Sequence, residues 1–370
     1  MRPPQNNDVA LCIPTFRRPE LLAELLNDLS RQSVQPGFVI VVDGDSGSGE
    51  VLRVLQGYGT EFGLPIRYAP SNHGNLAYQR YLGWRDAASE GCQILVYLDD
   101  DLRISDRHSL EHLIAPMLSS SSEVVGCTGE IRFGDLQKIG EEELSVRDRH
   151  EFSQKPRPSL VKLFGSSRGL HPGELTASGH RCPPDRSAGL QVPVHWLRGG
   201  VMAYRMSALD EDCFSTTLFA IYETRCGRGE DTLLSRRVAS RGRLVMVFDA
   251  VFEHPNMDAP KAYATKAFRM GEATAYSRRL LNDNYRWPAA PTLADRLALW
   301  KSYAGNTMLD VFRALRSPKA HRFVYAWGYF CGAFKGVFLP PSHKRLTPHI
   351  DWQNDAAAAL SQCVNLTAKS

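Results

Sequence analysis

The sequence predicts an α/β fold in which helices flank a mixed, mostly parallel sheet, followed by a helical C-terminal extension. Three observations support this prediction. Short apolar segments alternate with amphipathic ones from residue 9 to residue 118. The apolar segment 94–98 runs directly into three carboxylates, Asp99, Asp100 and Asp101. From about residue 256 onward the pattern is helical and basic, without strand signals.

The first elements follow one another as strand–helix pairs. Strands are expected at 9–14, 38–42, 66–69 and 94–98, and helices at 19–29, 50–58 and 75–88. Pro19 occupies the preferred first turn of its helix, and leucines at 21, 22, 25, 26 and 29 form its apolar face. Because such alternation gives right-handed crossovers, the sheet should be mostly parallel.

The second half of the chain is less regular. A helix is expected from residue 106 to about 118, and a strand at 124–133. Residues 134–195 are rich in Pro, Gly, Ser and Arg and predict a long, loop-rich insertion of the functional kind. A regular pattern of secondary structure resumes at 196–205, and it is followed by a predicted helix at 230–240 and a predicted strand at 244–252.

Charge and composition limit the function classes. The 370 residues carry a net charge of only +4, which does not indicate a nucleic-acid partner. Residues 261–345 hold 15 Lys and Arg against 4 Asp and Glu, so this segment is +11 and the remainder is −7. Eight scattered cysteines without metal-site spacing, and no signal-like N-terminus, indicate a cytoplasmic protein with reduced thiols.

The acidic triplet at 99–101 predicts a divalent-cation site. In open α/β sheets, ligands bind beyond the carboxyl ends of the strands. Three adjacent carboxylates repel one another, and oxygen ligands suit Mg²⁺ or Mn²⁺, which commonly also bind substrate phosphates. A solvated acidic turn is the alternative, which the preceding buried strand disfavours.

Two later features join the triplet. Glu230 and Asp231 follow two glycines at the start of an amphipathic helix. Acids at that position can also be explained by capping and by the helix dipole, without a catalytic role. His254 comes just after a strand, where a histidine can serve as a metal ligand or play a structural part.

Taken in order, these motifs resemble the inverting glycosyltransferases of family 2, which have the GT-A fold. The resemblance rests on VALCIPTFRRPELLAELLNDL, Asp43 after the second strand, YLDDDL, GEDTLL and His254, and it covers roughly residues 8–255. It divides the chain into a catalytic domain at 8–255 and a basic, aromatic-rich helical extension at 256–370. A dinucleotide-binding oxidoreductase is disfavoured because no Gly-x-Gly-x-x-Gly follows the first strand.

The resemblance implies a role for each motif. The residues that would bind the nucleotide sugar are Pro14, Thr15, Arg17, Asp43, Asn72, Gly74, Arg80, Asp99 and Asp100. Arg80 would face the diphosphate, although Tyr81 departs from the family's usual Asn. Asp99, Asp101 and His254 would hold Mn²⁺ or Mg²⁺.

On the acceptor side, Asp231 would be the catalytic base, and Glu230 would orient the acceptor or the adjacent loop. Trp196, Arg198, Gly199 and Gly200 resemble the family's acceptor-side loop, where the backbone must approach the sugar closely. A packing role for Trp196 is the alternative.

The expected partners are a nucleoside-diphosphate sugar, with a UDP-sugar favoured, and a glycan, lipid-linked or other glycoconjugate acceptor. Cations and aromatics interleave at 256–345, which indicates either a helical cap or a peripheral contact with an anionic membrane, on the inner face of the plasma membrane. A sugar-nucleotide nucleotidyltransferase and a non-catalytic nucleotide-sugar-binding protein are the competing functions.

Overall fold

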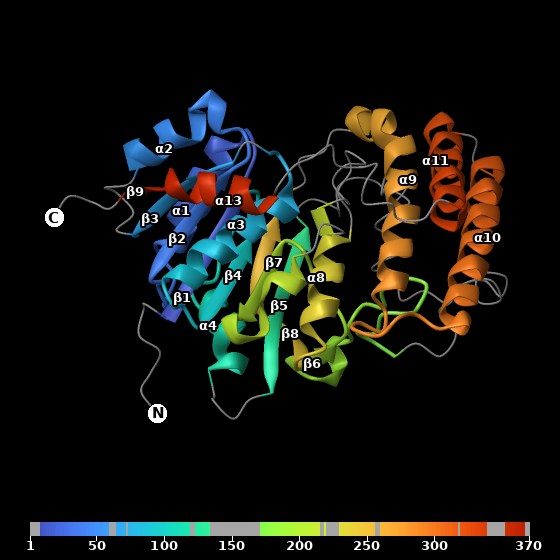
Figure 1. Cartoon of the computed structure of the whole chain (residues 1–370), viewed down its shortest axis with the longest axis horizontal. Helices are drawn as coiled ribbons and strands as arrows, with labels where there is room; N and C mark the ends of the chain where they lie inside the picture. Colours follow the sequence, from blue (N-terminus) through green and yellow to red (C-terminus); the bar gives the residue numbers. More distant parts are fainter. Residues whose placement is uncertain are drawn as a thin grey trace.

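A computed structural model describes residues 8–58, 64–71, 73–118, 123–133, 171–214, 218–219, 229–255, 260–316, 319–338 and 352–366. It holds one sheet of nine strands in the order β6-β8-β5-β7-β4-β1-β2-β3-β9. The strands are β1 (Val9–Thr15), β2 (Phe38–Asp43), β3 (Ile66–Pro70), β4 (Ile94–Leu98), β5 (Val124–Phe133), β6 (Gln191–Val194), β7 (Val201–Arg205), β8 (Arg243–His254) and β9 (Val364–Leu366). Figure 1 shows the sheet at the left and a group of long helices at the right.

The predicted fold class is confirmed. Strands β1 to β4 are mutually parallel, and β5 pairs in parallel with β8. Antiparallel pairing brings in β6, β7 and β9, which makes the sheet mixed but mainly parallel. Residues along β1 alternate between two apolar layers: Ala10 and Cys12 belong to one, and Leu11 and Ile13 to the other.

Helices cover both faces of the sheet. One layer is packed by α1 (Pro19–Leu29), α2 (Glu50–Tyr58) and α4 (Ser109–Ile114). The other is packed by α3 (Leu76–Ser89), α8 (Glu230–Val238) and α13 (Trp352–Ser361). On this second face the aromatic rings of α3 and α13 meet, as in the Tyr78–Trp352 pair with ring centroids 4.7 Å apart.

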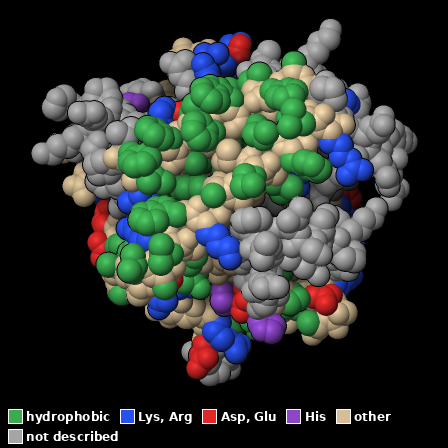
Figure 2. Space-filling model, turned by 90° about the vertical axis from the view of Figure 1, so that its right-hand side faces the viewer, with side chains coloured by type: hydrophobic (Ala, Val, Ile, Leu, Met, Phe, Trp, Pro, Cys, Tyr) green, Lys and Arg blue, Asp and Glu red, His purple; other side chains and the backbone are tan. Residues whose placement is uncertain are grey.

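The C-terminal part forms a separate helical layer. It contains α9 (Pro260–Asp283), α10 (Leu293–Arg316) and α11 (Ala320–Phe338), which lie side by side in Figure 1. The helices α10 and α11 face outward, and Figure 2 shows that many apolar side chains gather on that side of the molecule. Within the described residues, no helix is long and apolar enough to cross a membrane.

Two strands differ from the sequence prediction. Strand β6 lies inside the segment expected to be loop-rich, where Pro193 and its short length hid it. Strand β9 lies in the segment expected to have no strand, and it pairs antiparallel with β3. Helix α13 packs on the sheet and β9 joins its edge, so residues 352–366 lie with the sheet although they follow the bundle α9–α11 in the sequence.

Candidate active site

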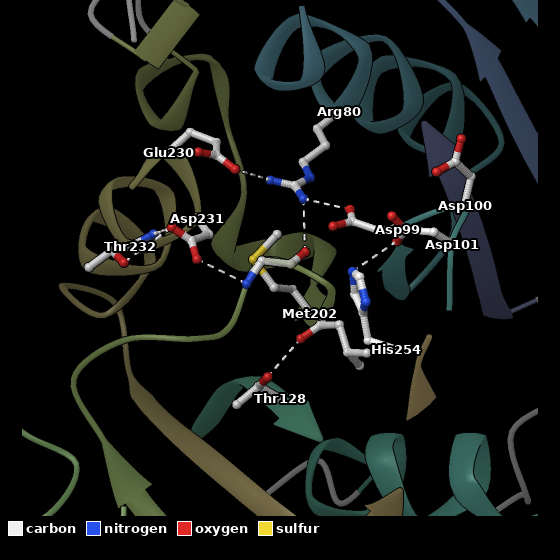
Figure 3. A network of polar contacts seen from close by, with 12 residues as sticks. Arg80, Asp99, Asp100, Asp101, Thr128, Met202, Glu230, Asp231, Thr232 and His254 are labelled. Atoms are coloured by element: carbon white, nitrogen blue, oxygen red, sulfur yellow. Dashed lines mark hydrogen bonds and ion pairs between the residues drawn. The ribbon is translucent and has the colours of Figure 1, made fainter. Parts of the chain in front are cut away.

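The three predicted acids lie just past β4 (Figure 3), and all three contact side chains of other elements. Asp99 accepts a hydrogen bond from Arg80 at 3.0 Å. Asp100 is buried, and accepts from the hydroxyl of Thr15 at 2.7 Å. Asp101 accepts from Nη1 of Arg18 at 2.6 Å, and the same nitrogen lies 3.2 Å from Asp100. The triplet is therefore not a solvated turn.

Arg80 connects this triplet to the second acidic motif. Its side chain is 1% exposed, and Nη2 donates to Asp99 and, at 2.8 Å, to the carbonyl oxygen of Gly199. Nη1 donates to Oε1 of Glu230 at 3.2 Å. The guanidinium thus donates to three protein oxygens. A buried arginine needs such compensation, and these contacts fix α3, β4 and α8 relative to one another.

Asp231 stands at the start of α8, beside the predicted acceptor-side loop. Its Oδ2 accepts from the backbone N–H of Gly199 at 3.0 Å, and its Oδ1 accepts from the N–H of Thr232 at 2.7 Å. Arg181 approaches the same carboxylate at 3.5 Å. A Cβ at position 199 would lie 3.1 Å from Oδ2 of Asp231, which explains why glycine fits here.

Glu230 points away from Asp231 and toward Arg80 (Figure 3). Burial and the neighbouring charge of Asp231 raise its pKa to about 7, against the lowering effect of Arg80. Burial likewise raises the pKa of Asp99 to about 6. Carboxyl groups with raised pKa values are typical of active sites, and both of these share the same arginine.

Asp101 and His254 form a pair that suits a divalent cation. Nε2 of His254 lies 3.5 Å from Oδ1 of Asp101, and Nδ1 lies 2.9 Å from the carbonyl oxygen of Pro255. Because a carbonyl only accepts, Nδ1 carries the proton, and in the neutral ring Nε2 presents its lone pair to the carboxylate. A histidine fixed in this way by a backbone carbonyl is a common arrangement among metal ligands.

Among the described residues, no three His, Cys, Asp or Glu side chains form a metal-binding group. Two protein ligands nevertheless fit Mg²⁺ or Mn²⁺, because these ions keep several waters and commonly bind substrate phosphates. Asp99 is directed to Arg80, so Asp101 and His254 are the better-placed ligands of the three predicted ones.

The predicted nucleotide-side residues gather at the carboxyl ends of β1 and β2. Asp43 is fully buried and accepts from the hydroxyl of Tyr68 at 3.0 Å. Arg17 has a left-handed backbone, with φ of 58°, and its side chain donates to Asp45. Pro14 pairs with Val42 inside the sheet.

Gly74 lies against Phe16 just beyond these strand ends. A Cβ at position 74 would be 2.8 Å from the Phe16 ring, so any larger residue there would displace the ring. Phe16 itself is 45% exposed, so its ring also borders solvent. Asn72, predicted to open the same helix, lies outside the described residues.

The predicted acceptor-side residues form the connection into β7. Gly200 accepts from the backbone N–H of Asp99 at 3.0 Å, which ties this loop to the acidic triplet. The N–H of Arg198 donates to Thr128 at 3.3 Å. Trp196 is buried, and the guanidinium of Arg181 lies 5.1 Å from its ring centroid.

Some residues of this site escaped sequence reasoning. Arg18 follows the predicted Arg17. A second cation beside that residue, in a chain with three acids at a strand end, was the signal that could have identified it. Tyr68 lies in a predicted strand and Arg181 in the predicted loop-rich insertion, and neither has a local pattern that marks its contact. All three contact residues that are far away in the sequence.

Residues 10–171 match the family model described as "Glycosyl transferase family 2". No curated protein matches the chain.

Two solved structures illustrate the fold likeness. The mannosyltransferase PcManGT from Pyrobaculum calidifontis, solved with GDP-Man and Mn²⁺, is 16% identical, with a TM-score of 0.47 over 90% of this chain and 87% of its own. A fragment of TarS from S. aureus, solved with UDP-GlcNAc, is 12% identical, with a TM-score of 0.42 over 89% and 91%. Both TM-scores are below 0.5, so the likeness to a known family is carried by the sequence match: residues 10–171 are similar to the glycosyl transferase family 2 domain.

Proposed function

We propose that this chain is a metal-dependent, inverting glycosyltransferase. It would move a sugar from a nucleoside-diphosphate sugar, with a UDP-sugar favoured, to a hydroxyl of a glycan, lipid-linked or other glycoconjugate acceptor. The observation that carries the proposal is the buried Arg80 that joins the triplet acid Asp99 to Glu230, the neighbour of Asp231. This contact holds a donor-side acidic set and an acceptor-side carboxylate in one rigid arrangement.

In this proposal Asp231 is the general base. It takes the proton of the acceptor hydroxyl as that oxygen forms a bond to the anomeric carbon. The bond from this carbon to the diphosphate oxygen breaks in the same displacement, so the anomeric configuration inverts. Hydrogen bonds from Gly199 and Thr232 hold the carboxylate in place, and Arg181 adds a positive charge on its outer side.

On the donor side, Asp101 and His254 would hold Mn²⁺ or Mg²⁺, and Asp99 and Asp100 would border the nucleotide. When bound, the ion supplies positive charge to the departing diphosphate. Arg18 already offers a cation between Asp100 and Asp101, and Thr15 orients Asp100. Asp43, held by Tyr68, would contact the base.

The test is the release of nucleoside diphosphate from UDP-sugars and GDP-sugars by the full chain with Mn²⁺. Both nucleotides are included because the two similar structures hold one of each kind. We expect release from one donor and its loss in EDTA. Formation of a nucleotide sugar from a nucleoside triphosphate and a sugar phosphate would favour the nucleotidyltransferase instead. Donor binding without turnover, with every acceptor class tried, would favour a binding protein.

We also propose that the protein works in the cytoplasm at the inner face of a membrane, where lipid-linked acceptors are available. The catalytic unit would be residues 8–255 together with the returning segment 352–366, and the bundle α9–α11 would be its extension. The pairing of β9 with β3 supports this division.

A further inference from the structure

The outer face of α10 is an apolar stripe. Its exposed large apolar residues lie three or four positions apart, with one gap of eight, and this spacing places them on one side of the helix. They are Leu293, Leu297, Trp300, Met308, Val311 and Leu315, with exposed fractions between 43% and 70%. Phe312 adds a further ring at 58%. Exposed apolar residues are ordinary when scattered, but a contiguous set indicates a binding surface.

The neighbouring helix α11 also exposes apolar side chains. Its small residues face the protein interior and its large rings face outward, whereas large rings are usually the buried ones. Gly328 and Gly332 face α9, and a Cβ at either position would lie 2.1 to 2.5 Å from a backbone oxygen there. Phe323, Trp327, Phe330, Phe334 and Phe338 instead remain 42% to 66% exposed. In water, burial of large aromatic rings is favourable. A helix that buries its glycines and exposes its rings is therefore suited to contact an apolar medium on its outer side.

Charges on this face have one sign. In the described residues of 293–338, the only acids are Asp295 and Asp310, and both are buried. The charged side chains that are exposed there are Lys301, Arg316, Lys319 and Lys335, of which Lys335 forms an ion pair with Glu272 of α9. Figure 2 shows the outcome: apolar side chains spread over this side of the molecule, with Lys and Arg around and between them.

We propose that the outer face of α10 and α11 is a docking surface for a bilayer that contains anionic phospholipids. Both helices would lie in the plane of the interface, with Trp and Phe rings at the boundary of headgroups and acyl chains and cations on the lipid phosphates. A second copy of the chain fits less well, because an isologous contact would bring like-charged lysines and arginines together.

The inner side of α10 contacts the segment that leads to the proposed active site. On α10, Ser302 lies 3.0 Å from Nε2 of His180. Arg181, which follows His180 in the chain, lies 3.5 Å from the carboxylate of Asp231. A bilayer on the outer face would therefore lie one helical layer from the proposed base, which suits an acceptor carried by a lipid. This last step rests on the proposed function, whereas the docking surface does not.

Vesicle flotation of the full chain, without nucleotide or metal, tests the surface. We expect the chain to float with vesicles of 70% phosphatidylcholine and 30% phosphatidylglycerol, and at least fivefold less with pure phosphatidylcholine. The double variant W327E/F334E should reduce the floated fraction at least fivefold. L190E/V364E is the matched control: it also places two acids at exposed apolar positions, 55% and 44% exposed, but outside α10 and α11. It should float like wild type.

Thermal unfolding shows whether each variant is folded, and M308E/L315E on α10 gives an independent second test. A chain that stays in the soluble fraction at low salt, or a folded W327E/F334E that floats like wild type, would overturn the proposal. So would a dimer in solution that W327E/F334E converts to a monomer, without vesicle binding. Sugar transfer is absent from this assay, so the docking surface can succeed or fail independently of the enzymatic activity.

Discussion

Nη1 of Arg80 lies 3.2 Å from Oε1 of Glu230, and this contact joins helix α3 to the first turn of helix α8 across the site (Figure 3). The two residues are 150 positions apart in the chain. The contact places Glu230, the neighbour of the proposed base Asp231, close to the acidic triplet.

Two replacements of Arg80 should have different effects: R80M should lower stability, and R80K should lower activity in a protein that still folds. R80M leaves Asp99 and Glu230 without their shared cation, which should lower the free energy of unfolding by about 3–5 kcal/mol. R80K keeps one charge but cannot donate to two carboxylates and a carbonyl together, so transfer should fall at least about tenfold in a folded protein. Urea unfolding and steady-state transfer measure the two effects. An R80K enzyme with wild-type turnover would contradict the bridging role.

Glu230 should make stability depend on pH. Its pKa is raised from an ordinary 4.5 to about 7 in the folded protein, chiefly by burial. Between these values the folded chain holds a proton that the unfolded chain has lost, so the free energy of unfolding falls as pH rises from 5 to 8. E230Q lacks this group, so the fall should be smaller in the variant. Urea unfolding at both pH values checks it, and equal falls would show that Glu230 is not the source.

Gly199 should be intolerant of a methyl group for a local reason. A Cβ there would lie 3.1 Å from Oδ2 of Asp231, so G199A should shift the carboxylate by a few tenths of an ångström. We expect kcat to fall about tenfold or more while the donor still binds, because the donor-side acids are untouched. G57A is the control, since a Cβ at position 57 meets no atom within 4 Å. Equal kcat values in both variants would refute the explanation.

Removal of a proposed metal ligand should weaken nucleotide binding only when metal is present. D101N and H254A should each lower the affinity for UDP, or for GDP if that is the donor nucleotide, at least about tenfold with Mn²⁺. In EDTA, wild type and variants should bind equally weakly. Titration calorimetry with E24Q as a remote control gives the comparison. Unchanged Mn²⁺-dependent affinity in both variants would place the ion elsewhere.

Much of the fold could be predicted from local patterns. Strand β5 begins and ends at the predicted residues, and α1 begins at Pro19 as its first-turn preference indicates. Strand β9 could not be found in this way, because three partly exposed residues carry no periodicity and their strand conformation depends on pairing with β3. Local patterns do not encode pairing between residues so far apart.

The candidate site was predictable to a similar degree. The acidic triplet and Asp231 stand in recognisable motifs, at a strand end and a helix start. The contacts that define their roles are not local: Arg18 bridges Asp100 and Asp101, and Arg181 reaches Asp231 from the predicted insertion. The burial of Arg80 also depends on three elements meeting, which no single segment encodes.

The most direct test of the central claim is sugar transfer by D231N. This change keeps the size of the side chain and, with the remaining oxygen toward Gly199, that hydrogen bond, but it gives up the hydrogen bond from Thr232 and removes the proton acceptor. We predict that transfer falls by a factor of about 10² to 10⁴, while Mn²⁺-dependent binding of the donor nucleotide stays within about twofold of wild type. Near-normal turnover in D231N would show that Asp231 is not the general base.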